Sequence, residues 1–402
     1  MFRTARVLCA LAGLTVLTVT TSCTATQQSP AATGVQPVPV RALLPVLRLP
    51  LAGKQAFAAP LVVSAAYGQV TSVVVTGSQG PVAGTLGAAG WTSSDQLLPA
   101  SHYRIAAQVA DLAGATHALA LTTTTAEAEH ELAAVLTPGD GRVVGVGMPL
   151  TVLLNRPVAD SADRRAVLAR LTVTTAPAIA GSWRFMSNTE IHYRPATFWP
   201  AGTAITLTSD LSYLQLADQV TWGQVGAHTT SYRIGASMVS TVDLTAYTMT
   251  VRRAGQVLRV LKMSAGSPRY PTKGGVHIVL AKARLQLFDS ATVGIPRNSA
   301  DGYYKKLPWA VRISNGGAFV HAQPASVSSQ GIRNVSHGCI NLSPADASWF
   351  YSLSRLGDVV DVIHAVVPPV LSDPGMSDWN LAYDAWAEPA AAQTQPAQLA
   401  RQ

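Results

Sequence analysis

Cysteine is scarce in this chain of 402 residues, which contains three of them, two within the first 23 positions. Cys339 stands alone in the rest of the sequence, so no second cysteine is available there for an intrachain disulfide. This distribution excludes a small fold stabilised by several disulfides. Charged residues are scarce too, at 12 %, whereas Ala, Thr, Val and Gly are abundant. That balance favours strands over charged helix bundles.

Long hydrophobic runs are missing beyond the N-terminus. The apolar stretch at residues 7–20 is itself shorter than a typical membrane-spanning helix. Two arginines precede this stretch, which is typical of an export signal. The four residues that end at Cys23 resemble a bacterial lipobox, in which the signal is cut before the cysteine and the thiol is acylated. We therefore predict a signal peptide over residues 1–22 and lipidation of Cys23. The alternative is an ordinary signal peptide that is cleaved nearby, for example after Ala25, without lipidation.

This reading predicts an exported lipoprotein at the outer face of the plasma membrane or in the cell wall. The formal net charge of +8 comes mostly from single arginines spread through strand-like runs, without a dense basic stripe or interleaved aromatic residues. Nucleic acid is therefore not a predicted partner. A polyanionic cell envelope or an anionic lipid surface is a better match to the positive charge than nucleic acid is. The alternative is that the charge only keeps the protein soluble.

Short runs rich in Val and Thr, bounded by Gly, Pro and Asn, predict a mainly β protein. Residues 23–58 are rich in Gln, Pro, Ala and Thr and are predicted to form a disordered tether. The spacing of the next runs is typical of small antiparallel sandwiches, which predicts one immunoglobulin-like domain at 59–136 and a second at 137–236. A helical turn is expected at 163–170 within the second.

A third β-rich unit is predicted at 237–365; it begins with a β run at residues 238–240, and a hairpin follows within residues 246–263. Later in this unit, Ser343 as N-cap and the proline after it start a short helix, which Gly357 is expected to end. Cys339 should therefore lie on a strand or turn just before a helix.

Two tryptophans lie in residues 366–388, and side chains of this size should dock on the folded body. This segment is therefore predicted to pack against the rest of the protein. Residues 389–402 are mostly Ala, Gln and Pro and are predicted to be disordered.

The lone thiol lies in the segment Ser336-His337-Gly338-Cys339-Ile340-Asn341, and His321 precedes it. A thiol becomes a nucleophile when a base takes its proton, and acyl transfer also needs N–H donors for the developing oxyanion. A free thiol is mostly protonated at neutral pH, and His321 can supply the missing base. Gly338 allows the tight backbone that aims such donors.

Simpler explanations exist for each of these residues. A lone cysteine is often a small apolar filler, and a lone histidine is often a structural group. Metal binding that includes His277 is a further alternative, but the spacing of His321, His337 and Cys339 is not that of a zinc finger. We predict neither a metal nor a cofactor.

The motif resembles the signature of the L,D-transpeptidases of bacterial cell walls. The resemblance to their actinobacterial and mycobacterial branch covers about residues 137–388 and includes further segments: Gly294-Ile295-Pro296, Pro308-Trp309-Ala310, Phe319-Val320-His321, Trp349-Phe350-Tyr351 and Asp378-Trp379-Asn380. That branch carries two immunoglobulin-like domains ahead of a β-rich catalytic domain, and often a lipoprotein signal. The resemblance therefore implies the same order of domains here.

The resemblance also implies a two-step acyl transfer on peptidoglycan stem peptides. Cys339 would be the nucleophile and His321 the general base, with His337 shaping the site and the backbone N–H groups of Gly338 and Cys339 as oxyanion donors. The thiol would attack the bond between the third and fourth residues of a tetrapeptide stem, D-alanine would leave, and a diaminopimelate amine would then attack the thioester. The product would be a 3→3 cross-link.

Tyr303, Ser336 and Asn341 are the implied substrate-binding residues, with Tyr303 in a lid-like loop at about 296–317. The chain departs from the branch at Ala322, where a serine is common, and we count this position among the substrate contacts. If its main-chain oxygen orients the histidine, alanine suffices. Ala325 likewise replaces a common aromatic residue and is expected to open the donor pocket.

Two other functions stay open on the sequence. An L,D-carboxypeptidase would use water in place of the amine acceptor on the same thioester. A non-catalytic wall-binding protein would rely on the sandwich domains, although the intact Cys339 and His321 argue against it.

Overall fold

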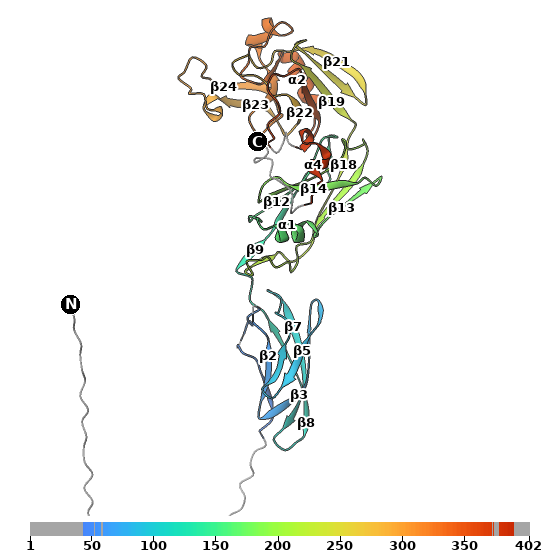
Figure 1. The fold of residues 1–402 in the computed structure, drawn as a ribbon, viewed down its shortest axis with the longest axis vertical. Helices are drawn as coiled ribbons and strands as arrows, with labels where there is room; N and C mark the ends of the chain where they lie inside the picture. Colours follow the sequence, from blue (N-terminus) through green and yellow to red (C-terminus); the bar gives the residue numbers. More distant parts are fainter. Residues whose placement is uncertain (1–42, 52, 58, 372, 374–377, 390–402) are drawn as a thin grey trace, which may run out of the picture.

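The computed structural model describes residues 43–389, apart from positions 52, 58, 372 and 374–377. Within this part of the chain, three β-rich domains follow one another along the sequence (Figure 1). The predicted signal peptide, Cys23, the first part of the predicted tether and the C-terminal tail from residue 390 lie outside the described residues. Among the helices that are described, none combines the length and the apolar character needed to cross a bilayer.

The first domain is a sandwich of two antiparallel sheets. One sheet contains, in spatial order, β1 (Val46–Arg48), β2 (Val62–Ala66), β6 (Gly90–Ser93) and β5 (Gly84–Gly87); the other contains β4 (Gly80–Val82), β3 (Gly68–Gly77), β7 (His102–Asp111) and β8 (Thr116–Thr124). Along β7 every second side chain is buried, and Ile105 is fully enclosed. The alternation seen in the sequence therefore gives one face to the core and the other to solvent.

The predicted tether of residues 23–58 is wrong at its C-terminal end. Val46–Arg48 forms strand β1 and pairs with β2. Leu47 and Leu49, two positions apart, pack against the first core together with Phe57. The flanking prolines do not prevent this because β1 lies at the edge of its sheet, where a missing N–H is tolerated.

The second domain is also a sandwich, as predicted. Its sheets contain β10 (Ala134–Thr137), β12 (Leu150–Leu154), β15 (Glu190–Pro195) and β14 (Gly181–Phe185), and β11 (Val143–Val144), β18 (His228–Ile234), β16 (Ala204–Ser209) and β13 (Leu171–Ala176). Because β10 pairs with β12, this domain begins before the predicted boundary at residue 137. A parallel pair, β9 (His130–Leu132) and β17 (Thr221–Gly223), lies where the chain enters it.

The helical turn predicted in the second domain is present as α1 (Ser161–Leu168). Asp160 caps it, because its carboxylate accepts hydrogen bonds from the amides of Ala162 and Asp163.

The third domain contains two sheets and a helix. One sheet contains β21 (Gln256–Lys262), β20 (Thr248–Arg253), β19 (Met238–Asp243), β27 (Val359–Ile363) and β22 (Gly275–Ile278); the other contains β23 (Ala281–Asp289), β24 (Tyr304–Arg312), β25 (Phe319–Ala322) and β26 (Ile340–Leu342). The predicted hairpin is β20–β21. Two short 3₁₀ helices lie between strands of the second sheet: η1 (Ser290–Val293) follows β23, and η2 (Pro324–Ser329) lies between β25 and β26. Helix α2 (Pro344–Leu353) contributes Phe350 to the shared core.

Helix α2 begins as predicted, with the Ser343 hydroxyl accepting from the Asp346 amide. It ends before Gly357, however, with Ser354 as its C-cap, so that part of the prediction is wrong. Gly357 has a φ of 81° and sits so close to Met148 that a Cβ atom would meet the Met148 Cβ at 2.5 Å. This glycine serves the contact between the second and third domains and does not end the helix.

Backbone hydrogen bonds join the second and third domains directly. The Gly145 amide donates to the Leu356 carbonyl at 2.7 Å, and the Gly147 amide donates to the Gly357 carbonyl at 2.8 Å. Val359 of β27 belongs to the hydrophobic core of the second sandwich. The two domains therefore share a packed and hydrogen-bonded interface.

Residues 378–389, which we call the C-terminal segment, dock on the second sandwich, as the tryptophans predicted. The indole of Trp379 donates to the Gly147 carbonyl at 2.7 Å, and that of Trp386 donates to the Ser182 carbonyl at 2.9 Å. Trp386 lies in α4 (Tyr383–Trp386) and is fully buried. Tryptophan suits this role because it buries a large apolar ring and still places its N–H on an acceptor.

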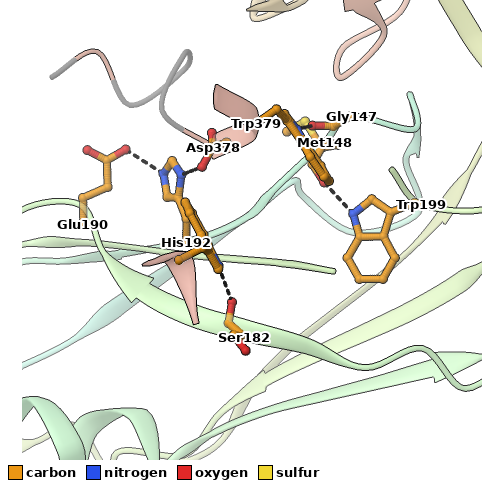
Figure 2. Close-up of polar contacts among 9 residues, drawn as sticks. Gly147, Met148, Ser182, Glu190, His192, Trp199, Asp378 and Trp379 are labelled. Atoms are coloured by element: carbon orange, nitrogen blue, oxygen red, sulfur yellow. Dashed lines mark hydrogen bonds and ion pairs between the residues drawn. The ribbon is translucent and has the colours of Figure 1, made fainter. Parts of the chain in front are cut away.

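A buried charged cluster lies beneath this segment. Figure 2 shows the imidazole of His192, on β15, between the carboxylates of Asp378 and Glu190, at 2.7 Å and 2.9 Å. Burial alone lowers the pKa of His192, but the two carboxylates outweigh it and raise the pKa to about 10. The imidazole is therefore a cation held between two anions.

Candidate active site

The site lies where β25 and β26 run side by side as parallel strands, with His321 paired in register with Asn341. A bridge between Gly266 and Ser336 fixes the chain just before the bend that carries Cys339. Strand pairing thus brings together His321 and Cys339, which are far apart along the chain. Cys339 was predicted on a strand or turn just before a helix; it lies in a bend, and the short strand β26 separates it from α2.

Cys339 is partly buried, and its side chain packs against a small apolar cluster of Phe288, Leu307 and Ala310. The thiol donates weakly to the carbonyl oxygen of Gly317 across 3.8 Å. Burial raises the pKa of Cys339 to about 11. The apolar surroundings therefore keep the resting sulfur protonated.

His321 is 3 % exposed, and its Nδ1 lies 2.9 Å from the carbonyl oxygen of Ala322. Because a carbonyl only accepts, Nδ1 carries the proton and donates it, which leaves Nε2 with a free lone pair. Burial lowers the pKa of His321 to about 4. The main-chain oxygen of Ala322 therefore orients the base, and a hydroxyl at this position is not needed for that contact.

Among the described residues, no hydrogen bond joins His321 to Cys339, since the thiol points to Gly317. Both side chains nevertheless line the same cavity. A neutral imidazole and a neutral thiol at one cavity can exchange a proton once a substrate draws the sulfur forward, because catalytic hydrogen bonds are often long in the free enzyme.

Ser336 holds the backbone around the nucleophile. Its hydroxyl donates to the Cys339 carbonyl at 2.6 Å and accepts from the Gly338 amide at 3.1 Å. Gly338 has a φ of 113°, which a residue with a Cβ atom rarely adopts. Of the two predicted oxyanion donors, the Gly338 amide is thus already engaged, whereas the described residues offer no acceptor to the Cys339 amide.

His337 is held between two aromatic rings. Its imidazole lies 4.7 Å from the ring of Tyr270 and 5.2 Å from that of Tyr303, measured between centroids. The Tyr270 hydroxyl in turn donates to Asp301 at 3.0 Å. His337 therefore forms part of the wall next to Cys339 and is not hydrogen-bonded to the thiol.

Two cavities meet at the thiol. The first, of about 220 Å³, is lined by Phe288, Tyr303, Lys305, Leu307, His321, Gln323, Ala325, Ser326, Val335, Ser336, His337, Cys339 and Asn341. The second, of about 290 Å³, is lined by Pro271, Lys273, His277, Thr292, Val293, Tyr303, Ser314, Gly316, Gly317, Ala318, His337, Gly338 and Cys339. Cys339, His337 and Tyr303 belong to both, so they form the wall between the two cavities.

Comparison with known proteins agrees with this geometry. The profile of the bacterial Ig domain family matches residues 53–215, and that of the L,D-transpeptidase catalytic domain matches residues 237–362. L,D-transpeptidase 2 of Mycobacterium tuberculosis is 35 % identical over 331 residues, which cover 82 % of this chain and 80 % of that protein. The chain belongs to the L,D-transpeptidase family.

Two further relatives support this membership. L,D-transpeptidase 1 of Mycobacterium tuberculosis is 35 % identical over 230 residues, covering 57 % of this chain and 84 % of that protein. A solved structure of the LD transpeptidase LdtMt1 in complex with imipenem aligns with a TM-score of 0.50 at 35 % identity, covering 57 % of this chain and 98 % of that chain. The family resemblance, the mainly β fold and the acyltransferase class predicted from the sequence are confirmed.

One prediction about this L,D-transpeptidase site is wrong, and another is only partly right. Ala322 is not a substrate contact, because its side chain is fully buried in the core behind β25 and lines neither cavity. The predicted lid-like loop at about 296–317 is present only in part, because Tyr304–Arg312 forms β24 and pairs with β23, whereas Tyr303 precedes that strand.

Sequence reasoning missed three parts of the transpeptidase site. They are the Gly317 carbonyl that meets the thiol, Phe288 from β23, whose ring lies 4.8 Å from that of His321, and Lys305 in the first cavity. None of them carries a motif, so only the pairing of distant strands reveals them.

The alternative of a metal site finds no support from His277. Its two ring nitrogens lie 3.3 Å from the Ile313 carbonyl and 3.1 Å from the Lys273 carbonyl. No group of three or more potential metal ligands gathers anywhere in the described part of the chain.

Proposed function

We propose that this chain is a peptidoglycan L,D-transpeptidase that forms 3→3 cross-links between diaminopimelate residues through a Cys339 thioester. The observation that carries the proposal is the arrangement of His321 and Cys339 on one cavity, with the Ala322 carbonyl holding Nδ1–H so that Nε2 is the base. The relatives named as L,D-transpeptidases support the substrate class.

In the first half-reaction, the Cys339 sulfur attacks the carbonyl of the third stem residue while His321 Nε2 takes the thiol proton. The tetrahedral intermediate then collapses. His321 returns the proton to the departing nitrogen of D-alanine, and a thioester is left on Cys339. The Cys339 amide, which has no acceptor among the described residues, is the donor aimed at the oxyanion.

In the second half-reaction, the side-chain amine of a diaminopimelate on a neighbouring stem attacks the thioester. His321 takes a proton from that amine and passes it to the departing sulfur, which restores the resting thiol. Two cavities that share Cys339 suit a reaction with two peptide substrates, one entering from each side.

The decisive experiment is intact mass spectrometry of the protein mixed with a stem tetrapeptide, compared with Cys339→Ala. We expect an adduct of the tripeptide acyl group on the unmodified chain and none on the variant. Cross-linked dimers as products support transfer, whereas free tripeptide alone would show an L,D-carboxypeptidase. Absence of any adduct on Cys339 with the stem, and with a carbapenem as an independent acylating probe, would favour a wall-binding protein.

We further propose that the chain is exported and lipid-anchored at Cys23 on the outer face of the plasma membrane. The charge, apolar stretch and lipobox-like residues at the N-terminus support this proposal. Labelling of the expressed protein with a clickable fatty acid tests it, because Cys23→Ala should remove the label. Retention of the label by that variant would refute the anchor at this position.

A further inference from the structure

Lys305 is the second residue of β24, and its side chain faces the cavity that holds Cys339 and His321. Leu307, two positions on, lines the same cavity, whereas Lys306 lines neither of the two. This follows from the strand period of two, which sends successive side chains to opposite faces. The chain therefore carries two adjacent lysines, of which one faces the reacting groups.

The positive charge of Lys305 has no acidic partner within the described residues. The nearby acids are already used: Asp289 pairs with Arg297, and Asp301 pairs with Arg269 at 2.7 Å. The Lys305 ammonium instead lies 5.6 Å from the centroid of the Tyr303 ring.

The cavity itself contains no carboxylate, because no Asp or Glu is among the residues that line it. Lys305 is exposed within it and acts electrostatically on both His321 and Cys339. A concave site with one unpaired cation and no anion attracts an anionic group of the ligand. The lysine ammonium binds such a group through charge-assisted hydrogen bonds.

A tetrapeptide stem of the diaminopimelate type offers such groups close to the bond that is cut. It carries free carboxylates on its second residue, on the diaminopimelate side chain and at its C-terminus, and amidation turns any of them into a neutral carboxamide. We infer that Lys305 is a specificity residue of this enzyme, whose ammonium binds a carboxylate of the donor stem and so selects donors that are not amidated at that position. This inference rests on the proposed transpeptidase function.

Lys305 has a second effect, because its charge also favours the thiolate form of Cys339. The two effects have different signatures. A field effect on the sulfur changes the acylation rate by the same factor for every donor. Recognition of a carboxylate changes the rate only for donors that carry it.

The test compares the unmodified chain with Lys305→Gln and with Lys306→Gln, which removes the same charge one position away on the opposite face of β24. Each protein is given four donors: a stem with all carboxylates free, and stems amidated at the second residue, at diaminopimelate or at the C-terminus. The measured quantity is kcat/KM for acylation, followed by intact mass. Thermal unfolding checks that each variant is folded, which we expect because both lysines are exposed.

We expect the unmodified chain and Lys306→Gln to prefer the free donor over one of the amidated donors by about tenfold. Lys305→Gln should lose this preference through slower acylation by the free donor only. The amidated donor that is disfavoured identifies the carboxylate. A reversed preference in Lys305→Glu would add support.

Two results would overturn the inference while leaving the proposed function intact: equal acylation of the unmodified chain by all four donors, or an equal loss in Lys305→Gln on every donor. Failure of the unmodified chain to be acylated by any donor would instead reject the proposed function, and this inference with it.

Discussion

At the scale of single residues, His321 and Cys339, the proposed catalytic pair, are neutral at rest. The same burial raises the pKa of Cys339 and lowers that of His321, because both charged forms lose hydration in the apolar wall. A preformed ion pair of thiolate and imidazolium is therefore disfavoured. In the proposed mechanism the proton therefore moves from Cys339 to His321 only during attack on the substrate, with His321 as the general base.

This neutrality predicts the pH dependence of the free thiol. Since the pKa of Cys339 is raised to about 11, ultraviolet thiolate absorbance should be missing at neutral pH and appear only in strongly alkaline solution. Cys339→Ser is the control that removes the signal. A thiolate band already present at neutral pH would contradict the neutral pair.

Gly338 offers a second prediction, based on its backbone. An alanine there meets no atom closer than 3.9 Å, so its cost is the strain of a φ of 113°, about 1 to 2 kcal/mol of stability. Because Gly338 adjoins the nucleophile, Gly338→Ala should slow acylation at least tenfold. Gly255→Ala, at φ 80° in the distant β20–β21 turn, should cost similar stability and leave acylation unchanged. Equal acylation rates in the two variants, measured by intact mass, would argue against a catalytic role for this backbone.

At the scale of elements, the C-terminal segment links the second sandwich to the site. Asp373, just upstream of it, accepts a hydrogen bond from the Gly316 amide at 2.8 Å. The neighbouring Gly317 supplies the carbonyl that meets the thiol. Further along, the Asn380 side chain bonds both the amide and the carbonyl of Val276 on β22. Asp373 therefore supports the turn beside the thiol, and the docked segment itself holds β22 of the same domain through Asn380.

The cluster around His192 predicts how this docking depends on pH. The pKa of His192 is raised from 6.5 to about 10 in the folded chain, so its contribution to stability is complete below about 6.5 and is lost as pH rises through about 10. Glu190 acts in the opposite sense: its pKa is lowered by the hydrogen bond from His192, so its contribution is lost as pH falls through that lowered value.

His192→Gln should therefore destabilise the second and third domains by about 3 kcal/mol, because it leaves the buried Asp378 without its cation. The loss should shrink as the pH approaches 10. Thermal unfolding monitored by tryptophan fluorescence measures it, and His228→Gln, at an exposed position on β18 of the same sandwich, is the matched control. A loss that is the same from neutral pH to pH 10 would exclude the charge of His192 as its cause.

At the scale of the whole molecule, the first sandwich lies at the end of the row of domains away from the site (Figure 1). It contributes no residue to either cavity at Cys339. With the anchor proposed at Cys23, the enzyme would act on wall material some distance from the membrane. The first sandwich therefore fits the role of a spacer.

Deletion of residues 46–127 tests that role, since it removes the first sandwich and leaves β9 to pair with β17. Acylation of the purified protein by soluble stems should be unchanged, whereas 3→3 cross-linking in cells, measured by muropeptide analysis, should fall severalfold. Insertion of an unrelated sandwich of similar length should restore it. Lost acylation of soluble stems would contradict the spacer role.

Much of the fold was predictable from local patterns. Alternating apolar residues gave strands such as β7, and Ser343 with its proline gave the start of α2. The predictions failed where distant parts of the chain meet. β1 forms because Leu47 packs against the core of the first sandwich. A glycine is required at position 357 because Met148 of the second domain leaves no room for a Cβ atom there. Neither partner is visible within a local window of sequence.

The amino-acid sequence by itself determined which residues we propose as the reacting groups of this transpeptidase, because a lone thiol, a glycine and two histidines form a chemical motif without reference to the fold. Only the tertiary structure decided how these groups are set. The pairing of β25 with β26 aligns His321 beside the cysteine loop, the Ala322 carbonyl orients its imidazole, and the pairing of β23 with β24 places Lys305 in the same cavity. The reason is that burial and strand register set protonation and orientation, and both arise from contacts between segments far apart in the chain.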